Sequence, residues 1–211
     1  MKKSAVEPVP TPTAASHANA LQLLERHGIV TREAVIAEGA AGGFAAVYGV
    51  LKVLEERGQV RRGYFVAGLG AAQFALPGAV DRLRSLREPD EPSAPLVLAA
   101  TDPAQPYGAA LLWPDNGGRP ARSAGAMVVL ADGLPQAWYD RRGHHLVVFG
   151  GARNDERWAD ALASLVKDGR LRSLEIRKVD GKTIAETGPE VVAPLKRVGF
   201  VDGYRGLVLR S

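Results

Sequence analysis

Apolar residues recur at helical spacing between residues 44 and 57. They lie three or four positions apart, so all of them fall on one face of a helix that can pack against a core. These residues are Phe44, Val47, Leu51 and Leu54. Two shorter helices are predicted upstream, over 18–27 with Ser16 as its N-cap and over 31–38 with Thr31 as its N-cap.

The pattern changes after Gly58, which is predicted to end the third helix. Residues 60–66 and 73–76 are predicted to form two β-strands, joined by a glycine-rich turn at 67–70. A fourth helix is predicted to begin at Pro77. Three helices followed by a two-stranded hairpin is the order of elements in a winged-helix domain, in which the hairpin is the wing.

Proline and charge content divide the chain into segments. Residues 1–15 show no periodicity and are predicted to be a disordered tail or the remnant of a linker. The winged-helix domain is predicted over 16–88, and the proline-rich, acidic residues 89–95 form a linker. Residues 96–211 combine strand-like and helical patterns. The predicted fold class is therefore α+β, a winged-helix domain followed by a mixed α+β domain.

In the second domain, apolar stretches bounded by turn residues predict a series of strands and two helices. One helix is predicted from Asn154 or Asp155 to Lys167, and a shorter one is interrupted at Pro194. The predicted turns are Asp132-Gly133, Arg142-Gly143 and Asp180-Gly181. The predicted strands are 96–100, 109–113, 126–131, 136–140, 146–149, 173–179, 182–186 and 206–210.

Composition narrows the class of protein. The chain has 211 residues, 46% of them hydrophobic, and no apolar run long enough to cross a membrane or to serve as a signal peptide, so a cytoplasmic protein is expected. It contains no cysteine, which excludes disulfides and thiolate metal sites. Its net charge of +4 favours polyanionic partners, although solubility alone also tolerates such a charge.

The predicted wing carries the residues best suited to contact DNA. Arg61 and Arg62 can each donate two hydrogen bonds to a phosphate, and a glycine turn lets backbone N–H groups approach closely. Tyr64 follows on the same strand, and Gln73 lies on the returning strand. The alternative is a solvated hairpin whose charges keep the edge of the sheet soluble. We predict that these four residues contact nucleic acid.

The third helix would face the DNA groove in a DNA-bound winged helix. Its predicted exposed side is only weakly basic, because Lys52 stands near Glu55 and Glu56. A dense base-reading surface is therefore not expected. We predict instead that Lys52 supports backbone contact and that Tyr48 offers a ring on which a base can stack. Single-stranded or forked DNA fits this surface better than a sequence-specific duplex.

The sequence offers little evidence for catalysis. His144 and His145 stand side by side, but no further ligands at suitable spacing predict a metal site. Asp102 lies in a proline-rich loop, where Asp-Pro more often makes a turn than holds a catalytic carboxylate. The chain has no GxxxxGK[ST] phosphate loop and no DEx[HD] motif, so it is not an ATP-driven motor by itself. No cofactor, metal or catalytic residue is predicted.

Several long stretches resemble a known family. GGFAAVYGVLKVLEERGQVRRGYFVAGLGAAQFALPGAVDRLR, LAATDPAQPYGAALLWP, AGAMVVLADGLPQAWYDRRG and GFVDGYRGLVLR are similar to the C-terminal region of the large helicase-related (Lhr) family of bacterial DNA helicases. The resemblance covers about residues 18–211 and excludes the family's ATPase domains. It implies DNA engagement and a role in repair. It also implies a naturally split or excised C-terminal piece, with a separate motor chain as a possible partner.

The resemblance leaves two alternatives open. The C-terminal region of the family is similar in architecture to winged-helix DNA glycosylases, which remove uracil or alkylated bases. Gln73, Asp102 and Asp202 are then candidates to activate water at a flipped nucleotide, although no family motif maps onto them. The other alternative is an assembly module, in which the wing and the Tyr107 loop bind protein surfaces.

Overall fold

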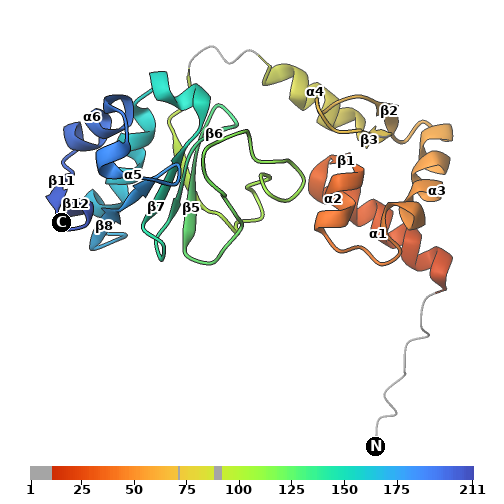
Figure 1. Cartoon of the computed structure of the whole chain (residues 1–211). Coiled ribbons are helices and arrows are strands. Elements are labelled where there is room, and N and C mark those ends of the chain that lie inside the picture. The colour runs from red at the N-terminus through yellow and green to blue at the C-terminus, as the bar shows by residue number, and fades with distance from the viewer. Residues whose placement is uncertain (1–10, 71, 88–91) are drawn as a thin grey trace, which may run out of the picture. The chain divides into compact units, whose positions relative to one another are not determined.

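The computed structural model describes residues 11–70, 72–87 and 92–211. The chain divides into two compact units, Met1–Pro89 and Asp90–Ser211 (Figure 1). Each unit has its own buried core. The first unit contains the helices and short strands of a winged helix, and the second is built around a six-stranded sheet. The predicted α+β class with an N-terminal winged helix is confirmed.

The first unit follows the winged-helix order of elements (Figure 1). Its three strands form one antiparallel sheet with the order β1-β3-β2, so that β3 is central. The wing consists of β2, β3 and the loop that joins them. The elements are α1 (Pro12–His27), β1 (Ile29–Val30), α2 (Arg32–Ala37), α3 (Gly43–Glu56), β2 (Arg61–Gly63), β3 (Gln73–Ala75) and α4 (Pro77–Ser85).

The core of the first unit forms where α1, α3 and β3 meet. The predicted apolar face of α3 is buried at Val47, Leu51 and Leu54, whereas Phe44 at its start is only partly buried. The Phe74 ring, 0% exposed, projects from the central strand into this cluster. Burial of large apolar side chains is the main stabilising contribution in such a small unit.

Three boundaries in the first unit differ from the sequence predictions. Helix α1 begins at Pro12 with Thr11 as its N-cap, so residues 12–15 are helical and Ser16 is not the cap; the rest of the predicted tail, 1–10, lies outside the described residues. Strand β1 has only two residues, too few to produce a periodic pattern, and was not predicted. Strand β2 pairs only over Arg61–Gly63, because beyond it a side chain takes over the backbone hydrogen bonds.

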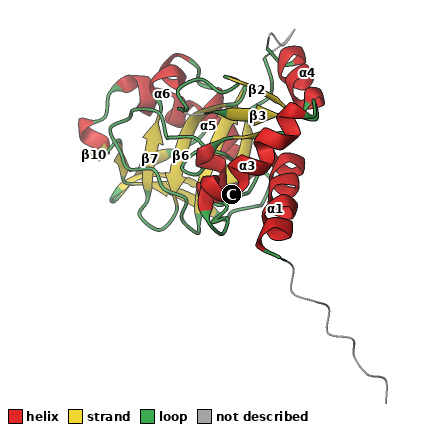
Figure 2. Ribbon diagram, turned by 90° about the vertical axis from the view of Figure 1, so that its right-hand side faces the viewer, coloured by secondary structure: helices red, strands yellow, loops and turns green. Residues whose placement is uncertain are grey.

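The second unit contains two sheets. The six-stranded sheet has the order β10-β9-β7-β6-β5-β4, with β7 and β9 parallel and the other neighbours antiparallel. Figure 2 shows its strands β10, β7 and β6 in this order. A smaller antiparallel sheet has the order β11-β12-β8. The elements are β4 (Leu96–Ala99), β5 (Ala126–Ala131), β6 (Leu134–Asp140), β7 (His145–Val148), a 3₁₀ turn (Gly150–Asn154), α5 (Arg157–Lys167), β8 (Ser173–Ile176), β9 (Lys178–Val179), β10 (Lys182–Thr183), a 3₁₀ turn (Ile184–Glu186), α6 (Pro189–Arg197), β11 (Val201–Gly203) and β12 (Gly206–Arg210).

Both faces of the larger sheet are buried, which the alternation of side chains makes possible. Tyr139 and Leu146 point to the face covered by α5, α6 and the smaller sheet. Trp138 and Val147 point to the opposite face, where Trp113 from the 101–125 connection packs. The Tyr139 hydroxyl donates to the carbonyl oxygen of Glu175 at 2.9 Å, and burial raises the pKa of Tyr139 to about 12.

Several second-domain predictions need correction. Residues 109–113 are not a strand; their connection makes only an isolated bridge between Tyr107 and Leu111. The predicted strand 173–179 is two strands, β8 and β9, which belong to different sheets. After β10, residues 184–186 form a 3₁₀ turn because Glu186 caps the backbone N–H of Thr183. Helix α5 begins at Arg157, and strand β11 was not predicted.

The predicted turns between strands are present. Asp132-Gly133 and Asp180-Gly181 both have two consecutive positive φ angles, the conformation of a tight hairpin turn. In the turn predicted at Arg142-Gly143, the left-handed residue is the next one, His144, with φ of 52°. The turn residues therefore fix where β5, β6 and β7 reverse direction.

Candidate nucleic-acid interface

The wing presents two free arginines. Arg61 pairs with Ala75 and Arg62 with Phe74 across the hairpin, and both arginine side chains are exposed. Neither guanidinium forms an ion pair with another described residue. Both are therefore available to an anion that approaches the wing, and no carboxylate competes for them.

Gln73 holds the loop of the wing from inside. Its side-chain oxygen accepts hydrogen bonds from the backbone N–H groups of Phe65 and Val66, each at 2.8 Å. Its side-chain nitrogen donates to the carbonyl oxygens of Val66 at 3.0 Å and Leu69 at 3.3 Å. The residue is 0% exposed. The prediction that Gln73 contacts DNA is therefore corrected: the buried amide organises the loop, because its polar atoms are already used.

Tyr64 lies beside this fixed loop and is 88% exposed. Its ring is in contact with solvent rather than with the core, unlike Phe65, which is half-buried. Arg61, Arg62 and Tyr64 thus all have exposed side chains on one short segment of the hairpin. Their contact with DNA stays a prediction.

Helix α3 does not offer a basic reading surface. Lys52 is exposed, but it is the one cation of the helix, and Glu55 and Glu56 follow it. The Tyr48 ring packs between the rings of Phe44 at 5.6 Å and Phe74 at 5.9 Å, measured between centroids. Tyr48 is only partly exposed. It lines a surface hollow with a volume of about 670 Å³, together with Arg32 and Ile36 of α2.

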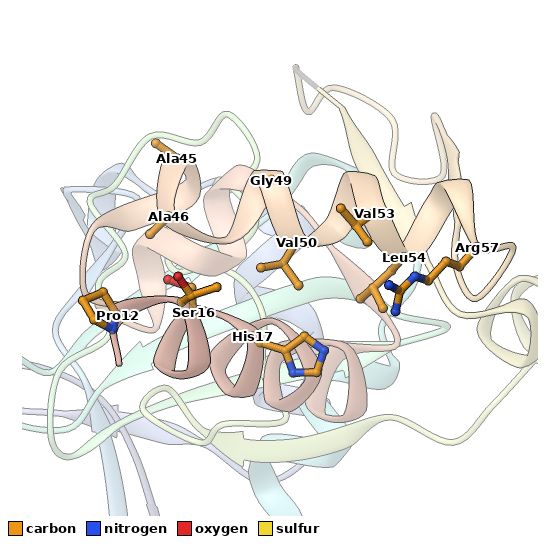
Figure 3. Close-up of a pocket in the computed structure, with 11 residues that line it drawn as sticks. Pro12, Ser16, His17, Ala45, Ala46, Gly49, Val50, Val53, Leu54 and Arg57 are labelled. Atoms are coloured by element: carbon orange, nitrogen blue, oxygen red, sulfur yellow. The ribbon is translucent and has the colours of Figure 1, made fainter. Parts of the chain in front are cut away.

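The side of α3 that is turned toward α1 forms an apolar groove with that helix (Figure 3). Val50, Val53 and Leu54 point from α3 toward α1, and Arg57 lies at the end of the groove away from Pro12. The groove has a volume of about 540 Å³. The helix that reads bases in many winged helices therefore carries small and apolar residues here, which agrees with the weakly basic side predicted from the sequence.

Three arginines near the wing were missed by the sequence reading. Arg57 caps the C-terminal end of α3, and Arg82 and Arg87 are exposed on and just after α4. None of them forms an ion pair with another described residue. A count of charges across 57–87 would have pointed to them, because that stretch contains six arginines and only one acidic residue.

The candidate catalytic carboxylates are engaged in local structure. Asp102 accepts a hydrogen bond from the backbone N–H of Ala104 at 2.9 Å, as a turn-forming aspartate does. Asp202 forms an exposed ion pair with Lys196 at 2.8 Å. Both carboxylates therefore take part in local contacts of the second unit, whereas Gln73 belongs to the first.

The two adjacent histidines have separate partners. His144 Nδ1 lies 3.3 Å from the carbonyl oxygen of Glu175, and His145 Nε2 accepts from the backbone N–H of Gly181 at 3.0 Å. Burial lowers the pKa of His145. Within residues 11–70, 72–87 and 92–211, no three histidine, aspartate or glutamate side chains are grouped in a way that could hold a metal ion.

The Tyr107 loop is packed rather than open. Tyr107 is 8% exposed, its ring stacks on Trp113 at 6.0 Å, and its hydroxyl donates to the carbonyl oxygen of Gly133 at 3.0 Å. Gln105, also buried, bonds to the backbone on both sides of it. The Tyr107 side chain is therefore not exposed for contact with a partner protein. None of the helices in the described part of the chain has both the length and the hydrophobicity needed to cross a bilayer.

Comparison with known proteins places this site in a family context. Residues 9–95 match the model described as the winged-helix domain of the large helicase-related protein. The chain is 47% identical over 215 residues to the "Lhr helicase/ probable uracil glycosylase" of Mycolicibacterium smegmatis, with 95% of this chain and 14% of that protein covered. It is 33% identical over 193 residues to the "Lhr helicase/uracil glycosylase" of Escherichia coli, with 88% and 12% covered. The chain thus spans only a small fraction of these relatives.

Proposed function

The chain is related to the large helicase-related (Lhr) family and carries its winged-helix domain, and from this premise we propose that it is a DNA-binding module of an Lhr-type helicase that acts in DNA repair. The observation that supports this proposal best is the pair of free arginines on the wing, Arg61 and Arg62. Both guanidinium groups are exposed and have no acidic partner among the described residues, so each can donate hydrogen bonds to a phosphate of a DNA backbone.

The surface of α3 also favours contact with the DNA backbone over the reading of bases. Base-specific recognition in the major groove uses hydrogen-bonding side chains on the helix that enters the groove. The outward side of α3 offers Ala45, Gly49 and Val53 there, with Lys52 as its one cation. We therefore propose that the module binds single-stranded or forked DNA in preference to a specific duplex sequence, and that a separate helicase motor chain is a possible partner.

The proposal is tested by fluorescence anisotropy with single-stranded, duplex and forked DNA at fixed ionic strength. We expect the Arg61→Ala/Arg62→Ala variant to bind each DNA about tenfold more weakly than the wild type, since it loses two charge-assisted contacts. The matched control is Arg170→Ala/Arg172→Ala, which removes the same charge from two exposed arginines of the second unit. Equal losses in both variants would indicate a general charge effect and would contradict a role for the wing.

A DNA glycosylase is the second candidate, because the printed names of both relatives include uracil glycosylase. The reaction needs a group that activates water and a pocket for the flipped base. Among the carboxylates considered above, Asp202 is the more accessible, and it forms an ion pair with Lys196 at the surface. Incubation of the full chain with uracil-containing DNA, without ATP and with a chelator, tests this candidate. Abasic sites that form in the DNA with the wild type but not with an Asp202→Asn variant would support a glycosylase. DNA whose uracil stays intact with the wild type would exclude it.

A further inference from the structure

The loop of the wing is fixed by a single side chain. All the hydrogen bonds of the Gln73 amide are made with the loop backbone: its oxygen accepts from the N–H groups of Phe65 and Val66, and its nitrogen donates to the carbonyl oxygens of Val66 and Leu69. A buried amide whose donors and acceptors are all satisfied holds its partners in one geometry, because any other arrangement would leave polar groups unpaired. The loop is thus preorganised from the inside.

Tyr64 stands between two anchored neighbours. Gly63 on one side is paired with Gln73 in the sheet, and a Cβ atom at this glycine would lie 3.0 Å from the Phe65 ring, so the ring packs directly on the strand. Phe65 on the other side has its N–H held by Gln73. The Tyr64 backbone is therefore constrained while its side chain, 88% exposed, points into solvent.

This combination suits stacking on a nucleobase. An aromatic ring on a constrained backbone has only two side-chain torsions left to order, so it loses little conformational entropy on binding. Every base has a face on which such a ring can stack, provided that the base is unpaired or at the end of a duplex. Arg61 and Arg62 lie on strand β2, just before Tyr64, and their exposed side chains can donate to phosphates near such a base.

We propose that Tyr64 stacks on the exposed base at the junction of single- and double-stranded DNA, an inference that rests on the proposed function. Gln73 is its positioning residue. The wing would then recognise the junction itself, the arginines supplying affinity and Tyr64 the preference for an open end. A protein surface is the other class of partner for an exposed tyrosine, and it is an outcome of the test below.

The experiment compares wild type, Tyr64→Ala and Tyr64→Phe by anisotropy on forked DNA and on an internally labelled hairpin-capped duplex without free ends. Tyr64→Ala is expected to lose about tenfold in affinity for the fork and less than twofold for the capped duplex, while Tyr64→Phe keeps the wild-type values because the ring is retained. A 2-aminopurine at the junction should be quenched on binding of wild type and Tyr64→Phe, and not of Tyr64→Ala.

The role of Gln73 is tested with Gln73→Met, which keeps the length of the side chain but removes its hydrogen bonds. We expect faster hydrogen exchange at the Phe65 and Val66 amides, unchanged protection in α3, and a loss of fork preference as in Tyr64→Ala. Unchanged fork binding and quenching in Tyr64→Ala, or an equal loss on both DNAs, would overturn the stacking proposal. If Arg61→Ala/Arg62→Ala still weakens binding in that case, the proposed function survives. If the wild type binds neither DNA, both proposals fail and a protein partner for Tyr64 is favoured.

Discussion

Replacing Phe74 by alanine is expected to lower the free energy of unfolding of the first unit by about 3–5 kcal/mol. The Phe74 ring is fully buried at the centre of this core and contacts the Tyr48 ring from the central strand of the sheet. Its removal leaves a cavity that the surrounding helices fill only partly. Since a unit of this size has a stability of only several kcal/mol, we expect it to be largely unfolded and to lose DNA binding.

The tryptophans allow this prediction to be checked unit by unit. All three, Trp113, Trp138 and Trp158, lie in the second unit. In Phe74→Ala, tryptophan fluorescence should remain native while hydrogen exchange across α1 and α3 becomes fast. Val53→Ala, at a partly exposed position on α3, is the control and should change little. Native protection of α3 in Phe74→Ala would contradict the importance of this core.

Replacing Trp158 by alanine should give the opposite pattern. Trp158 is 1% exposed and lies in the core between α5 and the larger sheet, together with Tyr139 and Leu162. We expect a loss of about 3–5 kcal/mol in the second unit, for the same physical reason. The remaining fluorophores, Trp113 and Trp138, report that unfolding by a red shift of their emission in urea.

The first unit should survive the Trp158→Ala change. Its core contains no residue of the second unit, so hydrogen exchange in α3 should stay slow and wing-dependent DNA binding should persist. Trp158→Phe, which keeps an aromatic ring in the cavity, serves as the milder control. Loss of DNA binding in Trp158→Ala would contradict a DNA site confined to the wing and would direct attention to the second unit.

The sequence predicted the elements whose side chains follow a clear period. The buried face of α3 was predicted correctly because Val47, Leu51 and Leu54 are spaced to fall on one side of a helix. Strands β5 to β7 were predicted because they are long and are joined by turn residues with positive φ. Both signals are local, so they can be read without knowing what packs against them.

The features that the sequence did not predict depend on contacts between distant residues. The two-residue strand β1 exists because β3 offers it hydrogen bonds, and its own sequence carries no signal. Residues 109–113 read as a strand but lie in a connection over the sheet, where Trp113 fills the apolar face. Their apolar pattern indicated burial correctly and secondary structure wrongly.

The candidate site shows the same division. Arg61, Arg62 and Tyr64 were found from residue type and from their place on a predicted hairpin, and the structure leaves all three side chains exposed. Gln73 was misassigned because a polar residue on a wing strand looks like a surface residue until its four hydrogen bonds are seen. Strand β3 has only three residues and all of them are buried, so no alternation in the sequence could show that Gln73 points inward.

The central claim is that the wing binds the phosphate backbone, and the salt dependence of DNA affinity tests it most directly. Anisotropy titrations of wild type and Arg61→Ala/Arg62→Ala on duplex and forked DNA, between 50 and 200 mM salt (roughly the range over which counterion release changes affinity strongly), give the slope of log Kd against log salt. We predict that the duplex slope is smaller in the variant by about 1.8, or about 0.9 for each lost phosphate contact. An identical slope in the two proteins, or no binding by the wild type at the lowest salt, would contradict the claim.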